Sequence, residues 1–502
     1  MPRSNPFATA AVCSFVALPA AADLTAEEVW ADLQAYTTSF GYEVTGQTSR
    51  DGQNLIVTDM QLNPPQLSDE NTGTMTIDQI VFRELGDGSV AIDVPSVMPI
   101  EMTTAVEGGE AATIKMDYTQ TGLDIVATGN PDNILYTYSA DTLALRSNQI
   151  LINGLSDDTA QPVINFELQG LAGTTDMSIE SQRQYDQIVN ATKAIYTVNI
   201  SDPSSGESVD MQGEMNDISF SGLTSLPLRS VSAADMDAML AAGFTVDGTF
   251  AFESSSLEMV GKGGGEEFAS MFTSQAGDLS VEMNANKLSY NASQSEVDVQ
   301  MSSSQFPIPL TLGIAQSGFE IAMPVRQSED PQDFAFGFNL NGVKVSDAIW
   351  SMFDPTSTLP RDPAAIVLQL DGRAKLLFDF LNPDLEAMQS FDGSPVELEQ
   401  VDVNKLQLSI AGAELSGTGE FEFKTTALGV PQPIGAIDLT LVGGNALIDG
   451  LVSIGLLPEQ QAMGARMMLG LLAVPGGEPD TLNSKIEINE MGHISANGQR
   501  IQ

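Results

Sequence analysis

The residues that could carry catalysis are sparse in this sequence. The one histidine, His493, stands in a Met-Gly-His-Ile-Ser segment close to the C-terminus. A Ser-His-Asp hydrolase would need that imidazole beside a serine on a sharp turn, but no Gly-x-Ser-x-Gly occurs. No lysine has a serine three residues before it, as a Ser-x-x-Lys dyad requires. We therefore expect His493 to be structural or solvent-exposed, and we predict no catalytic residues.

Cofactor and metal motifs are missing from the sequence as well. The glycine-rich stretch 261–265 lacks the Gly-Lys-Ser/Thr end of a phosphate-binding loop, so we interpret it as a flexible loop tip. One histidine cannot form a His-Glu-x-x-His zinc site, and the acidic clusters lack the spacing of a calcium loop. We predict no cofactor and no metal. Paired carboxylates of a glycoside hydrolase lie far apart in sequence, so spacing leaves that alternative open.

The charge of the chain restricts its partners. Its 502 residues include 67 Asp and Glu against 20 Lys and Arg, a formal net charge of −47. Nucleic-acid binding depends on basic side chains that displace counterions, so this composition argues against it. An acidic surface also repels anionic lipid head groups. We interpret the charge mainly as a solubility feature of a protein from a salty environment.

The first 22 residues have the pattern of a secretory signal. Arg3 supplies positive charge, a small and apolar run extends over residues 8–18, and Ala20-Ala21-Ala22 ends the segment. The apolar run is shorter than the ~20 residues that span a bilayer. We expect cleavage near Ala22, a periplasmic location and no transmembrane anchor in the mature protein. Cleavage would also remove Cys13, the only cysteine, and leave no thiol for disulfides or metal.

The dominant pattern after residue 40 is alternation of apolar and polar residues, clearest over 334–340 and 406–410. Such alternation predicts strands with one apolar and one polar face. Asp-Gly and Asn-Gly dipeptides tolerate the positive φ angles of tight hairpins. We predict a mainly β (α+β) fold of extended, twisted antiparallel sheets with a few packed helices. The dipeptides begin at residues 51, 87, 153, 247, 341, 371, 392, 449 and 497.

Six segments are predicted to be helical. Thr25 and Glu28 form a capping box before an apolar stripe that ends near Gly41. The last two helices meet at Pro458, which suits the first turn of a helix. The predicted helices are those after Thr25, over 179–196, from Ser232 to Gly243, over 346–353, over 444–457 and over 458–473.

Two six-residue segments of the chain resemble each other. The first helix ends in Gly-Tyr-Glu-Val-Thr-Gly at 41–46, and the third ends in Gly-Phe-Thr-Val-Asp-Gly at 243–248. A duplicated unit of one helix and a long meander would produce this echo. We therefore expect three parts: a signal peptide over 1–22, a first helix-plus-sheet unit over 23–230, and a second over 231–502 that ends in a helical hairpin and a final strand.

Methionine is the most suggestive excess in the composition, with 22 residues. Met463, Met467 and Leu471 form a stripe on the last predicted helix. Methionine is adaptable and suits surfaces that accept varied apolar ligands, although ordinary core filling is the favoured explanation of the excess. Trp350 is interpreted as a helix residue that packs on a sheet. These four residues are our candidates for a ligand groove.

Residues 342–373 carry a resemblance to a known family. A Trp-x-x-x-Asp-Pro motif begins at Trp350, and Leu-Pro-Arg-Asp-Pro covers 359–363. The chain resembles an alphaproteobacterial family of exported proteins, domain of unknown function 2125. This resemblance implies an envelope location and brings no catalytic residues. The loop residues Arg361 and Asp362 are interpreted as fixing the turn after the fourth helix. At fold level the chain is similar to AsmA-like envelope proteins, some of which guide lipids along an apolar groove, although it lacks their N-terminal anchor.

These observations lead to two main hypotheses. The first is a non-catalytic periplasmic protein that holds a lipid or other amphiphile in an apolar, Met-lined groove. The second is an interaction or assembly factor whose sheet edge or helical hairpin engages another envelope protein. An enzyme is a weaker alternative, and the aromatic content of 6% disfavours an outer-membrane barrel.

Overall fold

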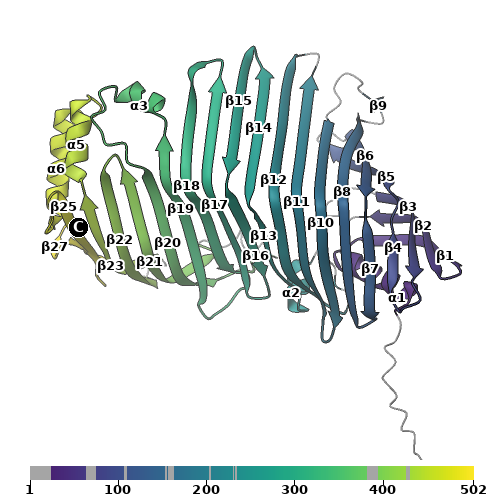
Figure 1. Ribbon diagram of the computed structural model, residues 1–502. Coiled ribbons are helices and arrows are strands. Elements are labelled where there is room, and N and C mark those ends of the chain that lie inside the picture. The colour runs from purple at the N-terminus through teal and green to yellow at the C-terminus, as the bar shows by residue number, and fades with distance from the viewer. Residues whose placement is uncertain are drawn as a thin grey trace, which may run out of the picture.

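The alternating segments form strands, and the strands join in one antiparallel sheet. The structure is a computed structural model. It describes residues 24–63, 75–106, 110–152, 155–156, 163–202, 205–229, 231, 235–381, 394–425 and 430–502. The predicted signal segment lies outside the described residues. Figure 1 shows strands that follow the chain from the purple N-terminal end of the sheet to the yellow C-terminal end. The mainly β, antiparallel fold is therefore confirmed.

The first half of the sheet ends in its longest strands, which are 20 residues long. The strand β8 pairs with β7 over one half and with β6 over the other, and its opposite edge pairs with β10 from Asn133 to Arg146. The strands are β1 (Glu43–Asp51), β2 (Asn54–Asn63), β3 (Met75–Glu84), β4 (Val90–Asp93), β5 (Val97–Val106), β6 (Glu110–Thr121), β7 (Asp124–Asn130), β8 (Asn133–Ile152), β9 (Leu155–Ser156), β10 (Val163–Ile179), β11 (Arg183–Asp202) and β12 (Glu207–Leu226).

The second half continues without a break, because β12 pairs with both β13 and β14. The sheet thus crosses residue 230, and the proposed division into two duplicated units stays a prediction. The strands are β13 (Thr245–Phe252), β14 (Ser254–Gly263), β15 (Glu266–Ser274), β16 (Ala276–Met283), β17 (Lys287–Ser303), β18 (Phe306–Pro324), β19 (Gln332–Val345), β20 (Ala364–Leu376), β21 (Val396–Ile410), β22 (Ala413–Thr425), β23 (Pro431–Val442), β24 (Val474–Pro475), β25 (Thr481–Ile488), β26 (Ile494–Ala496) and β27 (Gln499–Arg500).

Five of the predicted helices are present in the described part of the chain. The capping box of α1 is formed, with the Glu28 backbone N–H donating to Thr25 Oγ1 at 3.3 Å. Pro458 is the N-cap of α6, one position before the predicted one. The helix predicted from Ser232 begins later, at Met236, with Asp235 as its N-cap. The bounds are α1 (Ala26–Ser39), α2 (Met236–Ala241), α3 (Asp347–Phe353), α5 (Gly444–Ser453) and α6 (Glu459–Leu472).

The prediction of a helix over 179–196 is wrong, because most of this segment belongs to β11. Both edges of β11 are paired along its length, with β10 and with β12, which satisfies its backbone groups. Tyr185 is buried, whereas Ile188 is exposed and lies on the other face, so the apparent helical stripe does not exist. β-branched residues are frequent here and favour a strand.

The dipeptide turns are only partly as predicted. Those beginning at 51, 87 and 497 lie between consecutive strands, whereas those at 247 and 371 lie inside β13 and β20, and that at 449 lies in α5. Gly248 and Gly372 instead lie beside the rings of Phe220 and Phe334. The dipeptide at 341 sits at a register shift within β19. Those at 153 and 392 lie outside the described residues.

The core is concentrated where α1 and α2 cover one end of the sheet. Trp30 of α1 packs against Phe82 with ring centroids 5.8 Å apart, and Tyr36 packs edge-on against Tyr185 at 4.7 Å. The same cluster includes Met239 of α2, so this methionine serves ordinary packing. Figure 1 shows both helices near the lower ends of the strands. Among the described helices, none combines the length and the apolar character needed to cross a bilayer.

A buried polar network fastens α1 to the sheet. The carboxylate of Asp32 is 5% exposed and forms an ion pair with Arg183. It also accepts hydrogen bonds from the Tyr136 hydroxyl at 2.7 Å and the Tyr185 hydroxyl at 3.2 Å. Burial raises the pKa of both tyrosines above the ordinary range, and the Asp32 charge adds to this effect. The network fixes the position of the helix that closes one end of the sheet.

Candidate functional site

One face of the sheet carries a continuous row of apolar side chains. Cross-strand partners connect Phe220 of β12 to Phe250, then to Leu279, and onward through β17–β21. Because paired residues point to the same side of a sheet, the row lies on a single face. We call it the central row. Its members are Phe220, Phe250, Leu279, Ala292, Phe319, Phe338, Leu368 and Leu406.

The middle of the central row is partly exposed to solvent. The side chains of Leu279, Phe319 and Phe338 are 38–43% exposed, although they are large and apolar. Isolated exposed apolar residues are common in soluble proteins, but a contiguous exposed patch marks an interaction site. The opposite face carries Asp, Ser, Asn and Gln at the intervening positions, for example Asp278 and Ser293 beside Leu279 and Ala292.

Aromatic rings lie over glycines on this apolar face. A Cβ added to Gly173 would lie 2.6 Å from the Tyr138 ring, and one added to Gly277 would lie 2.3 Å from the Phe252 ring. Glycine therefore leaves the space that a flat-lying ring occupies. Other such pairs place Gly213 beside Tyr196, Gly261 beside Phe268, and Gly372 beside Phe334.

The alternation changes phase at one level across the sheet. In β12 the apolar positions are odd-numbered before Asp217 and even-numbered after it, and in β17 they are even-numbered before Glu296 and odd-numbered after it. Both residues have positive φ, near 51° and 45°, and Gly170 of β10 and Gly342 of β19 do too. An irregularity of this kind turns two successive side chains to one face, as in a β-bulge. The apolar side chains of each strand then continue on the same face beyond it.

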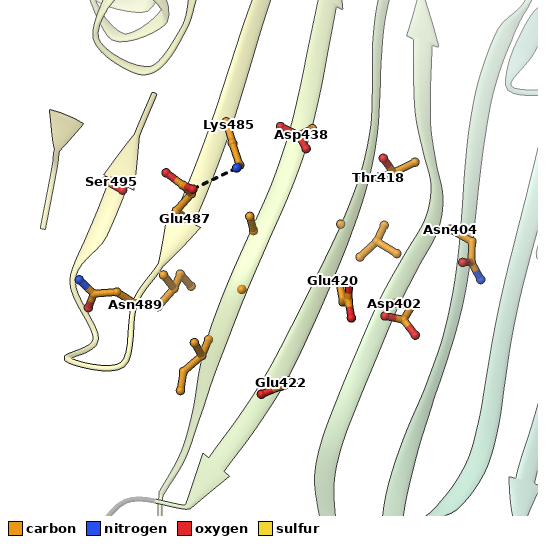
Figure 2. A pocket seen from close by; sticks show the side chains of 16 residues that line it. Asp402, Asn404, Thr418, Glu420, Glu422, Asp438, Lys485, Glu487, Asn489 and Ser495 are labelled. Atoms are coloured by element: carbon orange, nitrogen blue, oxygen red, sulfur yellow. Dashed lines mark ion pairs between the residues drawn. The ribbon is translucent and has the colours of Figure 1, made fainter. Parts of the chain in front are cut away.

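The opposite, polar face has a hollow of about 990 Å³ near the C-terminal end. Figure 2 shows its charged lining on β21–β25. Lys485 is its only basic residue, and its Nζ lies 3.1 Å from Glu487. No group of His, Cys, Asp and Glu in the described residues has the arrangement of a metal site. Carboxylates dominate this surface, so it suits contact with water rather than an apolar ligand. They include Asp402, Glu420, Glu422 and Asp438.

The four residues singled out in the sequence lie outside the central row. Met463, Met467 and Leu471 form an exposed stripe on α6, where Met467 is 75% exposed. The end of α6 is tied to the sheet because Ser484 Oγ donates to the Leu472 carbonyl at 2.6 Å. Figure 1 places α5 and α6 at the C-terminal end of the sheet. Their role in ligand binding stays a prediction.

Trp350 lies in α3, as predicted for a helix residue, and specific contacts hold its side chain. Its ring packs against Phe353 and lies under the Arg361 guanidinium at 5.9 Å. Arg361 also forms an ion pair with Asp347 and donates to Ser357 Oγ at 2.7 Å. Arg361 thus fixes the turn after α3.

Asp354, the aspartate of the Trp-x-x-x-Asp-Pro motif, stabilises the same turn. Asp354 is fully buried and accepts backbone hydrogen bonds from Thr358 and Leu359, both at 2.9 Å. Burial alone would raise its pKa, but these bonds outweigh burial and lower it. The motif is explained by loop structure. The side chain of Leu359 then packs against α5 at Gly450.

His493 lies in the turn between β25 and β26, where its backbone N–H donates to Asn489 Oδ1 at 3.1 Å. The structure gives it a place in a turn and no interaction that indicates chemistry.

The sequence analysis did not predict the central row. Alternation identified its strands, for instance 334–340, but only the pairing register shows that apolar residues from many strands align. The exposure of the row depends on which segments cover the sheet, and this is a tertiary property.

Comparison with known proteins identifies the family. The family model described as "Uncharacterized protein conserved in bacteria (DUF2125)" matches residues 227–490, more than half of the chain, and the chain belongs to this family. Searches of curated proteins and of solved structures found no match.

Proposed function

We propose that this member of the DUF2125 family is a non-catalytic periplasmic protein of the cell envelope that holds the apolar chain of a lipid or other amphiphile. The observation that carries the proposal is the exposed central row, whose large side chains stay in contact with water. Covering them with an acyl chain would remove apolar surface from water, which is favourable by roughly 25 cal/mol per Å². The acyl chain would lie against a sheet face that is already formed, so binding would require little ordering of the protein.

The two faces of the sheet support this assignment by their contrast. Polar side chains line the opposite face and keep the protein hydrated, so the apolar face is the surface suited to a lipid chain. The resemblance to AsmA-like envelope proteins agrees with this function. The alphaproteobacterial origin and the export of the chain remain parts of the proposal.

Native mass spectrometry tests the proposed function directly. The protein would be purified from a bacterial envelope fraction without detergent, then measured before and after incubation with a monoacylglycerol. We expect a bound amphiphile, or loading of the added one in a defined stoichiometry. A control protein of similar acidity shows the background of non-specific adducts. Failure to retain or accept any apolar ligand would contradict the proposal.

A second candidate function has its own observation. The exposed Met463, Met467 and Leu471 stripe on α6 is an unpartnered helix face, which an envelope protein could cover. Crosslinking in intact bacterial cells, with a photoreactive amino acid at Met467, separates the two functions. A single stoichiometric protein partner would favour an assembly factor, and its absence would favour lipid binding.

A further inference from the structure

The apolar face ends in a hollow at the upper ends of β11, β12 and β15. The hollow has a volume of about 450 Å³. Its apolar lining includes Ile200, Val209 and Phe268, and two of these side chains, Ile200 and Phe268, are exposed. The three belong to the alternation phase that carries Tyr196, Met211 and Phe272 along the same strands. The hollow therefore lies where the apolar face reaches the upper ends of these strands.

Carboxylates border this hollow on the same face. Asp202 and Glu207 are cross-strand partners, one alternation step beyond Ile200 and Val209, and Glu266 is one step beyond Phe268. Side chains two residues apart on a strand point to the same face. All three carboxylates therefore stand at the edge of the apolar lining.

The only basic residue in the lining is Lys262, and its Nζ lies 2.9 Å from Glu267. Lys262 and Glu267 are cross-strand partners and point to the face opposite Glu266 and Phe268, so this ion pair does not stand among the three carboxylates of the apolar face. An ammonium already paired with a carboxylate offers little attraction to an anionic head group.

Asp202 accepts a hydrogen bond from Ser205 and Glu266 accepts one from Gln305, but both donors are neutral side chains and leave the negative charges in place. A positively charged group beside these carboxylates would be attracted by their charges and by the field of a strongly acidic protein.

We propose that the amphiphile held on the apolar face carries a cationic head group, an amine or a quaternary ammonium, which sits among Asp202, Glu207 and Glu266 while its chain runs along that face beside Ile200 and Phe268. This inference rests on the proposed function and adds the chemistry of the ligand. An anionic lipid would place its charge against the same carboxylates, which like-charge repulsion opposes.

Amphiphiles that differ only in head group test this inference. Isothermal titration of the full mature chain would compare dodecyltrimethylammonium, a neutral dodecyl maltoside and dodecanoate, each below its micelle concentration. We expect the cation to bind roughly fivefold more tightly than the neutral compound, because one pair of unit charges at about 4 Å contributes about 1 kcal/mol even in water. Dodecanoate should bind more weakly than the neutral compound, and the preference should shrink as salt is added.

Two variants separate the rim from the overall charge. Glu207→Gln/Glu266→Gln removes two carboxylates from the rim, and Glu420→Gln/Glu422→Gln removes two from the hollow on the polar face. The rim variant should lose most of this roughly fivefold preference for the cation, while its affinity for the neutral compound stays the same. The control variant should keep the preference.

The outcomes distinguish the head-group inference from the proposed function. Equal binding of the cationic and neutral compounds would overturn the head-group inference alone. An equal loss of preference in both variants would overturn it too, since only net charge would then matter. If none of the three amphiphiles binds, the proposed function falls and this inference falls with it.

Discussion

A matched pair of leucines gives the sharpest test of which face binds an apolar chain. Leu279 lies in the central row, and Leu223 lies on the polar face of β12 between Gly222 and Thr224. Both side chains are 42% exposed. Leu279→Ser and Leu223→Ser therefore remove similar apolar groups from similar degrees of exposure. They differ in the face on which the group lies.

The expected size of the effect follows from that exposure. Complete burial of a leucine side chain contributes roughly 1.5–3 kcal/mol. The exposed 42% of Leu279 is what a ligand could still cover, so its loss should cost binding about 1 kcal/mol. That corresponds to roughly fivefold weaker binding. Leu223→Ser should leave the affinity unchanged.

The assay is a fluorescence titration with a neutral naphthylamine probe, which emits strongly in an apolar environment. Urea unfolding of both variants would show whether each substitution perturbs the fold to the same extent. Equal affinities for the two variants, or a larger loss for Leu223→Ser, would refute the assignment of the apolar face as the binding surface.

Three further predictions concern the framework that presents this face. Asp32→Ala should lower the free energy of unfolding by about 3–5 kcal/mol, because it leaves Arg183 without its buried partner. Asp93→Ala breaks an exposed ion pair with Arg83 and should lower it by at most about 1 kcal/mol. Urea titrations measure both values. Equal losses would contradict this account of the network. Burial raises the pKa of Tyr136, so the folded state keeps a phenol proton that the unfolded chain releases near pH ~10. The free energy of unfolding should therefore be constant below that pH and fall above it. A rise in the urea midpoint at alkaline pH would contradict this direction. Gly372→Ala should destabilise the fold by about 1–3 kcal/mol, because its Cβ would lie 2.3 Å from the Gln400 carbonyl oxygen and 2.6 Å from the Phe334 ring. Gly464 lies in open space on α6, so Gly464→Ala should stabilise the fold by about 0.5–1 kcal/mol. Thermal unfolding measures both effects. Stabilisation by Gly372→Ala would show that the ring does not lie over this glycine.

Local patterns were enough to predict much of the fold. The capping box at Thr25 and Glu28, the final helix pair and the strands over 334–340 and 406–410 all depend on neighbours in sequence. The segment 179–196 failed because its residues suit two periodicities, and only pairing with β10 and β12 decides between them. Tertiary pairing overrode the helical spacing.

The candidate site was less accessible to sequence analysis. Asp-Gly at 247 and 371 has the composition of a turn, but these glycines serve to accommodate the rings of Phe220 and Phe334 within strands. The Met463 stripe was recognised as apolar, yet a second apolar surface, the central row, arises from residues of many strands. Its existence depends on register, which composition does not encode.

Photocrosslinking tests the central claim most directly. A neutral diacylglycerol with a diazirine in one acyl chain would be bound to the protein, irradiated, and located by peptide mass spectrometry. We predict adducts on peptides that contain Leu279, Phe319 and Phe338, which an excess of unlabelled lipid should suppress. Adducts confined to α6 or to the polar face would contradict the claim, as would adducts that unlabelled lipid does not suppress.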